Sequence, residues 1–416
     1  MEGPYLIDLT RLSSRLGRGA LTGIDRVEFA WAEHLLAQPE PLFGLVRLKL
    51  SFALLDRNGI SHFVDMIRSQ GQPEPASLLA RCLWRKNPLR ARAETFVRRL
   101  AVARKLVPFL QSLLSPLPDK TTYLNLGHSN LTARVLSRLH RIGHKVVVLL
   151  HDTIPLDHPE YTRKGISQVF RRKLCAVAQH ADLVIHTTQT TREKSEHQMR
   201  ALGRVPFGIV SSLGVTSAPA QQNELPADLD LSKPFVIALG TVEPRKNLSL
   251  LCEVWDGATE LPRLLVVGHK GWADPQLFDR LSTTNGIEML GPLSDGAVAA
   301  LMDRALALVF PSLAEGFGLP PLEAAARGLP ILCSDLPVLH EILGDLPVYL
   351  KPTDVYGWGK AIHALGKERA EQTYRDCTLA RSRIELPTWE SHFNTILTAS
   401  VQESSARTRV GLGTAQ

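Results

Sequence analysis

Short apolar runs rich in leucine or β-branched residues alternate with longer amphipathic segments along most of this chain. This alternation constrains the fold most strongly, because strands followed by helices build βαβ units and parallel sheets. The strand candidates of the first half are Tyr5–Leu9, Thr122–Leu126, Lys145–Leu150 and Asp182–His186. Those of the second half are Phe235–Gly240, Arg263–Gly268, Ala305–Pro311 and Pro330–Ser334. The pattern predicts an α/β protein with two doubly wound sheets.

The length of the chain, 416 residues, exceeds what one hydrophobic core usually supports and so predicts two domains. Residues 216–233 are rich in Ala, Pro, Gln and Asp without a clear period, which predicts a linker. We therefore expect one domain at 1–215 and a second at 234–385, followed by a helix at 386–401 that packs back toward the first. The polar residues 402–416 predict a disordered tail.

Bulk properties exclude several classes of protein. Apolar residues make up 44% and charged residues 21%, which is typical of a globular chain. The longest apolar runs are too short to cross a bilayer, and Asp8 and Arg11 interrupt the apolar stretch where a signal peptide would need it. Five scattered cysteines without a CxxC pair favour reduced thiols in a cytoplasmic protein. They are Cys82, Cys175, Cys252, Cys333 and Cys377.

Basic residues concentrate in one segment: residues 81–105 contain nine Lys or Arg and a single acid, Glu94. Apolar residues over 96–114 recur at alternating four- and three-residue spacing, which predicts one face of a helix that Pro108 kinks or ends. The simplest interpretation is a packed helix with a solvated basic side. The alternative is a surface that rests on anionic lipid. Nucleic acid is a weaker third candidate, because no recognised binding motif accompanies the basic residues.

Two adjacent cations, Arg245 and Lys246, lie between the strand candidate Phe235–Gly240 and an apolar run that begins a helix. Cations there can neutralise a diphosphate, because ligands bind beyond the carboxyl ends of parallel strands and anions favour helix N-termini. The alternative is a solvated loop with a surface Arg-Lys pair, which this segment alone favours.

A segment rich in glycine and proline follows another strand candidate and reads Glu315-Gly-Phe-Gly-Leu-Pro-Pro-Leu-Glu323. Gly316 and Gly318 let the backbone approach a ligand closely. The two prolines suit the first turn of a helix, and Gly328 suits its C-terminal cap. These features predict that Glu315 lies on a strand-to-helix loop and that Glu323 lies in the first helical turn.

Glu315 and Glu323 would then flank one helix N-terminus, where vicinal sugar hydroxyls can donate hydrogen bonds to their carboxylates. Backbone N–H groups around Leu319 would face phosphate oxygens. The alternative is a capped helix with two solvated glutamates. It accounts for the capping residues but not for the glycines or for the coincidence with Arg245 and Lys246.

In the first half, His151 follows the strand candidate Lys145–Leu150 directly, so we expect it to point into the cleft between the domains. The alternative is a histidine bonded to neighbouring backbone, which this domain alone favours. A glycine-rich stretch from Gly17 to Gly23 precedes an amphipathic segment. It misses the dinucleotide-binding spacing by one residue, which argues against a dinucleotide site.

Together these segments resemble retaining glycosyltransferase family 4, and within it bacterial mannosyltransferase-like enzymes. The matching segments are Thr22–Arg26, His151-Asp-Thr-Ile-Pro155, Arg245-Lys246, Leu265–Trp272, Leu290–Asp295 and Glu315–Glu323. The resemblance implies the GT-B architecture, in which two Rossmann-like doubly wound domains face each other across a cleft.

The resemblance also implies roles for matching residues. The contacts with the donor are Arg245 and Lys246 for the diphosphate, Glu315 for the sugar, Glu323 for the ribose, and Phe317, Gly318 and Leu319 along the sugar and phosphates. In the first half, Gly23 belongs to a loop that faces the donor phosphate, and His151 lies beside the transferred sugar. Thr22 and Asp25 stand where glycines are more usual, which leaves their contacts open.

The implied reaction is transfer of a hexosyl group from a nucleoside diphosphate sugar with retention at the anomeric carbon. The histidine and Leu265–Trp272 segments resemble those of enzymes that use GDP-mannose, although the family also uses UDP-sugars. The expected acceptor is a bacterial surface glycan or a lipid-linked sugar. Because no Asp-x-Asp motif accompanies the phosphate loops, we expect no metal, and we expect no other cofactor.

Two other functions remain open. A non-catalytic nucleotide-sugar-binding protein would keep Arg245 and Glu323 but is expected to lose Glu315 or His151, and both are present. A nucleotide-sugar epimerase would need its own site residues, for which we find no candidates. We expect a cytoplasmic enzyme, peripheral on the inner membrane through residues 81–105, with no nucleic-acid partner.

Overall fold

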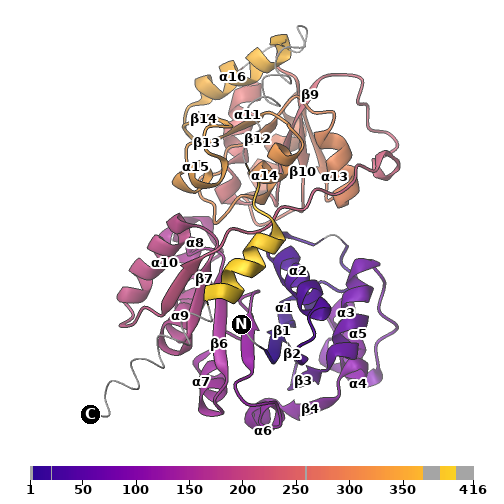
Figure 1. The fold of residues 1–416 in the computed structure, drawn as a ribbon. Helices are drawn as coiled ribbons and strands as arrows, with labels where there is room; N and C mark the ends of the chain where they lie inside the picture. The colour runs from indigo at the N-terminus through magenta and orange to yellow at the C-terminus, as the bar shows by residue number, and fades with distance from the viewer. Residues whose placement is uncertain (1–2, 20, 258–259, 369–384, 400–416) are drawn as a thin grey trace, which may run out of the picture.

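A computed structural model of the protein describes residues 3–19, 21–257, 260–368 and 385–399. The chain folds into two α/β units, and in Figure 1 the C-terminal unit lies above the N-terminal one. The predicted tail at 402–416 and Cys377 lie outside the described residues.

The N-terminal unit contains an eight-stranded sheet. Its strands in spatial order are β4 (Ala103–Leu106), β3 (Ser51–Leu55), β2 (Leu42–Arg47), β1 (Tyr5–Asp8), β5 (Thr122–Asn125), β6 (Lys145–Leu150), β7 (Leu183–His186) and β8 (Phe207–Val210). β3 pairs antiparallel with both β2 and β4, and every other neighbouring pair of this sheet is parallel. The connection from β2 to β3 is too short for a crossover, so these two strands form a hairpin.

The C-terminal unit contains a six-stranded sheet in which every neighbouring pair is parallel. Its strands in spatial order are β11 (Ile287–Gly291), β10 (Arg263–Val267), β9 (Phe235–Leu239), β12 (Leu308–Phe310), β13 (Ile331–Ser334) and β14 (Val348–Leu350). The chain moves outward from β9 in one direction and from β12 in the other. Ligands of open α/β sheets bind at such a switch point, beyond the carboxyl ends of the strands.

Helices cover both sheets (Figure 1). Those of the N-terminal unit are α1 (Thr10–Ser13), α2 (Gly23–Ala37), α3 (Arg57–Arg68), α4 (Leu78–Leu83), α5 (Pro88–Leu100), α6 (Leu110–Leu114), α7 (Ala133–Arg141), α8 (Ile154–Asp157), α9 (Ile166–His180) and α10 (Gln189–Arg200). Those of the C-terminal unit are α11 (Leu248–Asp256), α12 (Pro275–Thr283), α13 (Asp295–Met302), α14 (Leu319–Ala326), α15 (Pro337–Leu343) and α16 (Val355–Glu368).

Residues 389–399 form a further helix, which lies against the N-terminal unit near α2 (Figure 1). Phe393 packs edge to face on Trp31 with ring centroids 5.0 Å apart. The hydroxyl of Ser211 lies 3.0 Å from Nδ1 of His392. The end of the described chain therefore contacts the first unit, while the exact domain boundaries stay a prediction.

Each of the eight strand candidates overlaps a strand, and the predicted α/β class is confirmed. The described residues contain six further strands that the sequence did not predict: β2, β3, β4, β8, β11 and β14. Four of them are the edge strands β4, β8, β11 and β14. Edge strands pair on one side only and bury fewer side chains, so they lack the continuous apolar run of a central strand.

The predicted helix over 96–114 is wrong. Helix α5 ends at Leu100, and Ala103–Leu106 forms the edge strand β4, which pairs antiparallel with β3. Pro108 lies at the second position of a short 3-10 helix (Val107–Phe109), where its missing N–H is not needed, whereas in the interior of a longer helix it would remove a hydrogen bond. The ladder with β3 satisfies backbone groups that the helix would have used, and the apolar spacing alone could not reveal that distant partner.

Candidate active site

Two loops meet at the switch point of the C-terminal sheet. The loop after β9 contains the short 3-10 helix Pro244–Lys246 and leads into α11, and the loop after β12 carries Glu315 to the start of α14. The backbone N–H of Leu313 donates to the carbonyl of Arg245 at 2.7 Å, which holds the two loops together. Both cations and the first glutamate of the predicted site are therefore brought to one place.

Glu315 lies between the two cations. Its Oε2 is 2.6 Å from Nη1 of Arg245, and its Oε1 is 2.5 Å from Nζ of Lys246. The glutamate side chain is only 7% exposed. Burial alone would raise the pKa of Glu315, but the charges of Arg245 and Lys246 outweigh it and lower the pKa to about 2. The carboxylate is therefore ionised throughout the physiological range.

Arg245 has a second carboxylate partner that the sequence did not single out. Its Nε is 2.5 Å from Oε1 of Glu243, which is buried. Burial raises the pKa of Glu243, opposed by the charges of Arg245 and Lys246. The two cations are thus balanced by two carboxylates, and the loop sequence alone did not predict this balance.

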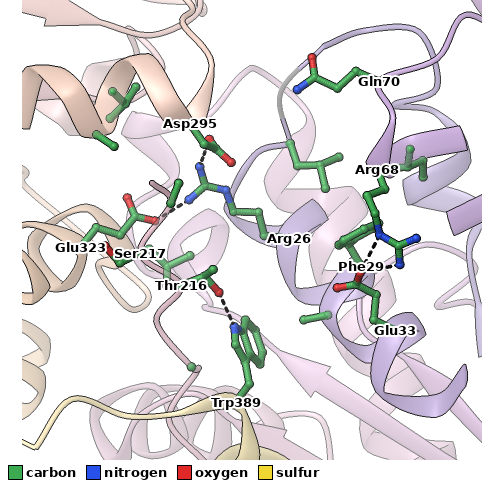
Figure 2. A pocket seen from close by; sticks show the side chains of 18 of the residues that line it. Arg26, Phe29, Glu33, Arg68, Gln70, Thr216, Ser217, Asp295, Glu323 and Trp389 are labelled. Atoms are coloured by element: carbon green, nitrogen blue, oxygen red, sulfur yellow. Dashed lines mark hydrogen bonds and ion pairs between the residues drawn. The ribbon is translucent and has the colours of Figure 1, made fainter. Parts of the chain in front are cut away.

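Glu323 makes its contact across the cleft. Arg26 of α2 donates to Oε1 of Glu323 and to Oδ1 of Asp295, at the start of α13 (Figure 2). Burial raises the pKa of Glu323, and the charge of Arg26 opposes this. The segment Thr22–Arg26 matches the family by sequence, but nothing in it predicts that Arg26 contacts Glu323.

A cavity of about 340 Å³ opens beside this ion pair, between the two units. Leu319 and Glu323 line it from α14, Asp295 from α13, and Phe29 from α2 (Figure 2). The described residues Arg245, Lys246, Glu315 and His151 are not part of its wall. The two glutamates of the predicted site therefore face different surroundings.

The start of α14 is shaped by Gly318, whose φ of 112° lies in the left-handed region that disfavours a side chain. The two prolines occupy the first helical turn as predicted, and Gly328 follows the helix with a φ of 63°. Glu323 is the fifth helical residue, so its predicted place in the first turn is wrong. Because Pro320 and Pro321 carry no N–H, they remove two of the donors expected for phosphate at this helix end.

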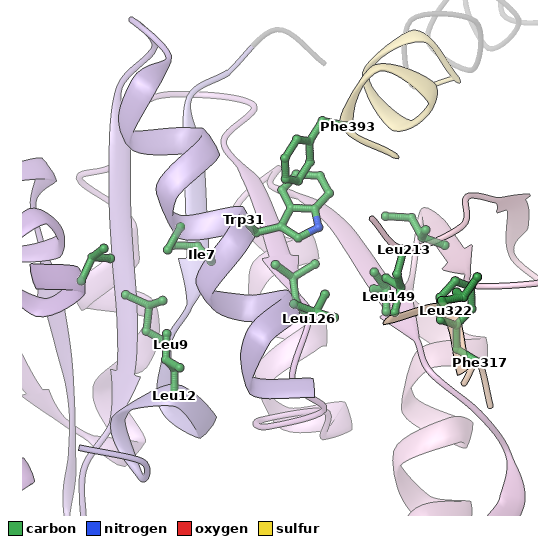
Figure 3. Packing of buried hydrophobic residues seen from close by; sticks show 14 of the residues in the cluster. Ile7, Leu9, Leu12, Trp31, Leu126, Leu149, Leu213, Phe317, Leu322 and Phe393 are labelled. Atoms are coloured by element: carbon green, nitrogen blue, oxygen red, sulfur yellow. The ribbon is translucent and has the colours of Figure 1, made fainter. Parts of the chain in front are cut away.

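The side chain of Phe317 belongs to the hydrophobic core. It is 6% exposed and lies in one cluster with Leu322 and Leu213 (Figure 3). Its ring therefore anchors the loop. At Phe317 only the backbone can therefore contact a ligand, together with the backbone of Gly318 and Leu319. The resemblance implies this role for the segment.

Gly23 is the first residue of α2 and faces α14. A Cβ built on Gly23 would lie 3.5 Å from Cδ1 of Leu319, an ordinary contact distance. Thr22 and Asp25, whose contacts the sequence left open, form the capping box of α2. Asp25 also pairs with Arg11 at 2.8 Å. These contacts fix the start of α2.

His151 is buried, and its Nε2–H donates to the carbonyl of Leu126 at 2.6 Å. Burial lowers the pKa of His151 to about 4, so the ring is neutral at pH 7. This bond agrees with the alternative prediction, in which the His151 side chain is bonded to neighbouring backbone. The contact with the donor loop comes from the main chain, since a Cβ on Gly316 would lie 2.5 Å from the carbonyl oxygen of His151.

No group of three or more His, Cys, Asp or Glu side chains in the described ranges is arranged to hold a metal ion. Of the helices that the structure describes, none is long and apolar enough to cross a membrane. The described cysteines, Cys82, Cys175, Cys252 and Cys333, carry free thiols.

Comparison with known proteins gives matches to family, sequence and structure. Residues 221–377 match the family model described as "Glycosyl transferases group 1". The serotype-specific mannosyltransferase WbdA of Escherichia coli is 30% identical over 232 residues, which is 50% of this chain and 28% of that protein. The O-antigen chain mannosyltransferase B of the same species is 28% identical over 58% of this chain and 69% of its own length. This chain thus spans less than a third of WbdA.

Solved structures share the fold over nearly the whole chain. Anabaena HepE, crystallised in complex with UDP and glucose, has a TM-score of 0.65 with 14% identity, and the match covers 95% of this chain and 99% of HepE. The sucrose-phosphate synthase of Thermosynechococcus elongatus has a TM-score of 0.58 with 14% identity, covering 97% and 100% of the two chains.

These structural matches confirm the predicted GT-B fold. Residues 221–377 match the glycosyl transferases group 1 family, and the predicted resemblance to mannosyltransferase-like enzymes of family 4 is confirmed.

Proposed function

We propose that this chain transfers a hexosyl group from a nucleoside diphosphate sugar to a glycan or lipid-linked acceptor, with retention at the anomeric carbon. The observation that carries the proposal is the placement of Glu315 between Arg245 and Lys246 at the switch point of the second sheet. A buried carboxylate that is ionised at physiological pH, next to two cations, offers acceptors for sugar hydroxyls beside donors for phosphate oxygens.

Glu315 would receive hydrogen bonds from hydroxyls of the transferred sugar. Each of its oxygens already accepts one bond from a cation, and a carboxylate oxygen has a further lone pair for a hydroxyl donor. The low pKa keeps the acceptor charged. The cations thus fix the position of the carboxylate before the donor arrives, which lowers the ordering cost of binding.

Arg245 and Lys246 would also oppose the charge that develops on the leaving diphosphate. Their carboxylate partners keep them ordered, and Lys246 is buried, so its charge is weakly screened by water. The N–H groups of Gly318 and Leu319, at the start of α14, would contribute donors to the same phosphates. The backbone at Gly23 faces this helix end from the other unit.

The nucleoside of the donor would occupy the cavity beside Glu323. A diol such as ribose can donate two hydrogen bonds to one carboxylate, and Arg26 is bonded to Oε1 only. The cavity has both polar and apolar walls, among them Leu319, Phe29 and Asp295, and its volume of about 340 Å³ suits a small ligand.

Mannose is the proposed sugar, with GDP as the proposed nucleotide and UDP as the alternative. The support comes from the names of WbdA and mannosyltransferase B, and from the local sequence segments. Because mannosyltransferase B is an O-antigen chain enzyme by name, we propose a bacterial surface glycan or its lipid-linked precursor as acceptor.

The basic segment 81–105 is proposed to contact anionic lipid on the cytoplasmic face of the inner membrane. Leu78 and Leu79 of α4 are 79% and 56% exposed, next to the basic residues Arg81 and Arg85. Exposed leucines beside arginines suit an acidic membrane surface. Sedimentation with phosphatidylglycerol vesicles tests this: Arg81→Glu/Arg85→Glu is expected to abolish co-sedimentation, and unchanged binding would contradict it.

The proposed activity is tested by incubating the purified protein with a panel of nucleotide sugars and following thermal shift and donor hydrolysis. We expect GDP-mannose to stabilise the protein and to be slowly hydrolysed, because a bound donor without acceptor can react with water. A protein that is stabilised by no nucleoside diphosphate would contradict the proposal. Stabilisation without any turnover would instead favour the non-catalytic binding protein.

A further inference from the structure

The end of β7 and the first turn of α10 carry buried threonines that contact the donor loop of the other unit. The hydroxyl of Thr191 donates to the carbonyl of Gly316 at 2.9 Å, and that of Thr187 lies 3.2 Å from the same oxygen. Both side chains are almost fully buried, at 4% and 0% exposure. One carbonyl of the C-terminal unit thus accepts two hydroxyl donors from the N-terminal unit.

The same helix end is held at a second point. Glu341 of α15 accepts hydrogen bonds from the backbone N–H groups of Gln189 and Thr190, and from the Thr190 hydroxyl at 2.8 Å. A carboxylate at a helix N-terminus satisfies free N–H groups and interacts favourably with the helix dipole. The C-terminal unit therefore docks on α10 through α15 as well as through the donor loop.

The carbonyl of Gly316 belongs to the peptide that leads into Phe317. In a trans peptide the C=O and the N–H point in opposite directions, so two bonds on the carbonyl also fix the direction of the Phe317 N–H. The loop has little freedom to drift, since a Cβ on Gly316 would lie 2.5 Å from the His151 carbonyl and 2.7 Å from Cβ of Asp152. The first peptide of the segment 316–319 is therefore oriented from the other unit.

We infer that Thr187 and Thr191 are positioning residues for transfer. They orient the segment 316–319 along the donor sugar and phosphates, and Glu341 holds α10 in register for this contact. The site is complete only when α10 is docked on the C-terminal unit, which couples closure of the cleft to assembly of the donor loop. This inference rests on the proposed function, because it assigns the threonines to that reaction.

The experiment compares Thr191→Val, Thr191→Ser and Ser195→Ala in steady-state transfer from GDP-mannose. Valine keeps the shape of threonine but removes the donor, while serine restores it. Ser195 supplies the matched control, because it is a buried hydroxyl of the same helix whose partners, His186 and the Arg192 carbonyl, lie in its own unit. Affinity for GDP and the melting temperature are measured for each variant.

We expect Thr191→Val to lower kcat roughly tenfold to a hundredfold, because a small misplacement of a loop at the reacting centre is costly. Affinity for GDP is expected to stay within about threefold, since Glu323 and the cavity are untouched. Thr191→Ser should recover kcat to within about threefold of the original protein, and Ser195→Ala should match it. Loss of kcat that serine does not rescue, or an equal loss in Ser195→Ala, would overturn the inference.

Glu341→Ala provides an independent check through a double-mutant cycle with Thr191→Val. If both residues act on one docked arrangement, the combined loss of kcat is smaller than the product of the single losses. Multiplicative losses would overturn the coupling. An original protein that transfers from no donor overturns the proposed function and this inference with it, whereas an active protein with an equally active Thr191→Val overturns the inference alone.

Discussion

The two glutamates of the donor segment differ in what holds them. Glu315 is bonded to Arg245 and Lys246, all within the C-terminal unit. Glu323 is bonded to Arg26, which belongs to the N-terminal unit (Figure 2). The carboxylate at the sugar end of the proposed site is thus held inside one unit, while the carboxylate at the nucleoside end is held by a contact between units. This difference predicts separate effects on chemistry and on binding.

The largest expected effect is at the sugar end. Glu315→Gln keeps the shape of the side chain but removes the charge between the two cations, so we expect transfer to fall about 10²–10³-fold. Affinity for the nucleoside diphosphate alone should change by less than about threefold. Kinetics and calorimetry measure the two quantities, with Glu288→Gln, an exposed residue paired with Arg263, as the control. Equal losses of nucleotide affinity and turnover in Glu315→Gln would contradict separate roles for the sugar end and the nucleoside end of the site.

Gly316 and Gly23 provide a second contrast, because both are glycines at the contact between units. A methyl group on Gly316 would collide with the backbone of His151, whereas one on Gly23 would meet Leu319 at an ordinary distance. We expect Gly316→Ala to lower kcat at least about tenfold and Gly23→Ala to leave it within about threefold. Transfer assays on both variants measure this. A large loss in Gly23→Ala would show that a ligand, and not Leu319, needs that space.

A smaller effect is expected at the nucleoside end. Arg26→Gln removes the cation that competes with a ribose diol for Glu323, so GDP is expected to bind about threefold to tenfold more tightly, as calorimetry would measure. Arg68→Gln is the matched control, since Arg68 lines the same cavity but pairs with Glu33 in its own unit. Weaker binding of GDP by Arg26→Gln would mean that Arg26 itself contacts the bound nucleotide.

The smallest expected effect is a difference in pH dependence between the sugar end and the nucleoside end of the proposed site. Glu315 has a pKa of about 2 and stays ionised down to acid conditions, while burial raises the pKa of Glu323. As pH falls from 7 to 5, affinity for GDP is expected to weaken by a few-fold more in the original protein than in Glu323→Gln, which cannot take up the proton. Protonation of GDP itself affects both proteins equally. An identical pH profile in the two would assign the change to another group.

Local sequence signals predicted the geometry of the loop and helix at 315–328 best. Gly318, with its left-handed backbone, the prolines of the first turn and the cap at Gly328 each determine the backbone only within a few residues. The loop and the helix could therefore be predicted from the local sequence. The ends of β9 and β12 then brought Arg245 and Glu315 together, because parallel strands end at one edge of the sheet.

Contacts between distant parts of the chain could not be predicted in the same way. Arg26 meets Glu323 across 297 positions of sequence, and Thr191 meets Gly316 across 125. The edge strand Ala103–Leu106 depends on its pairing with β3, and the helical spacing of its neighbours concealed it. In each case the deciding partner lies on another element, so no local pattern records it.

The arrangement around Glu315 is proposed to transfer a hexosyl group with retention. The most direct measurement follows GDP-mannose and a mannose-terminated lipid-linked acceptor by proton NMR, which resolves the anomeric configuration of the first product formed. We predict an α-linked product from the α-linked donor, with none above background in Glu315→Gln. A β-linked product, or full activity in Glu315→Gln, would contradict the account.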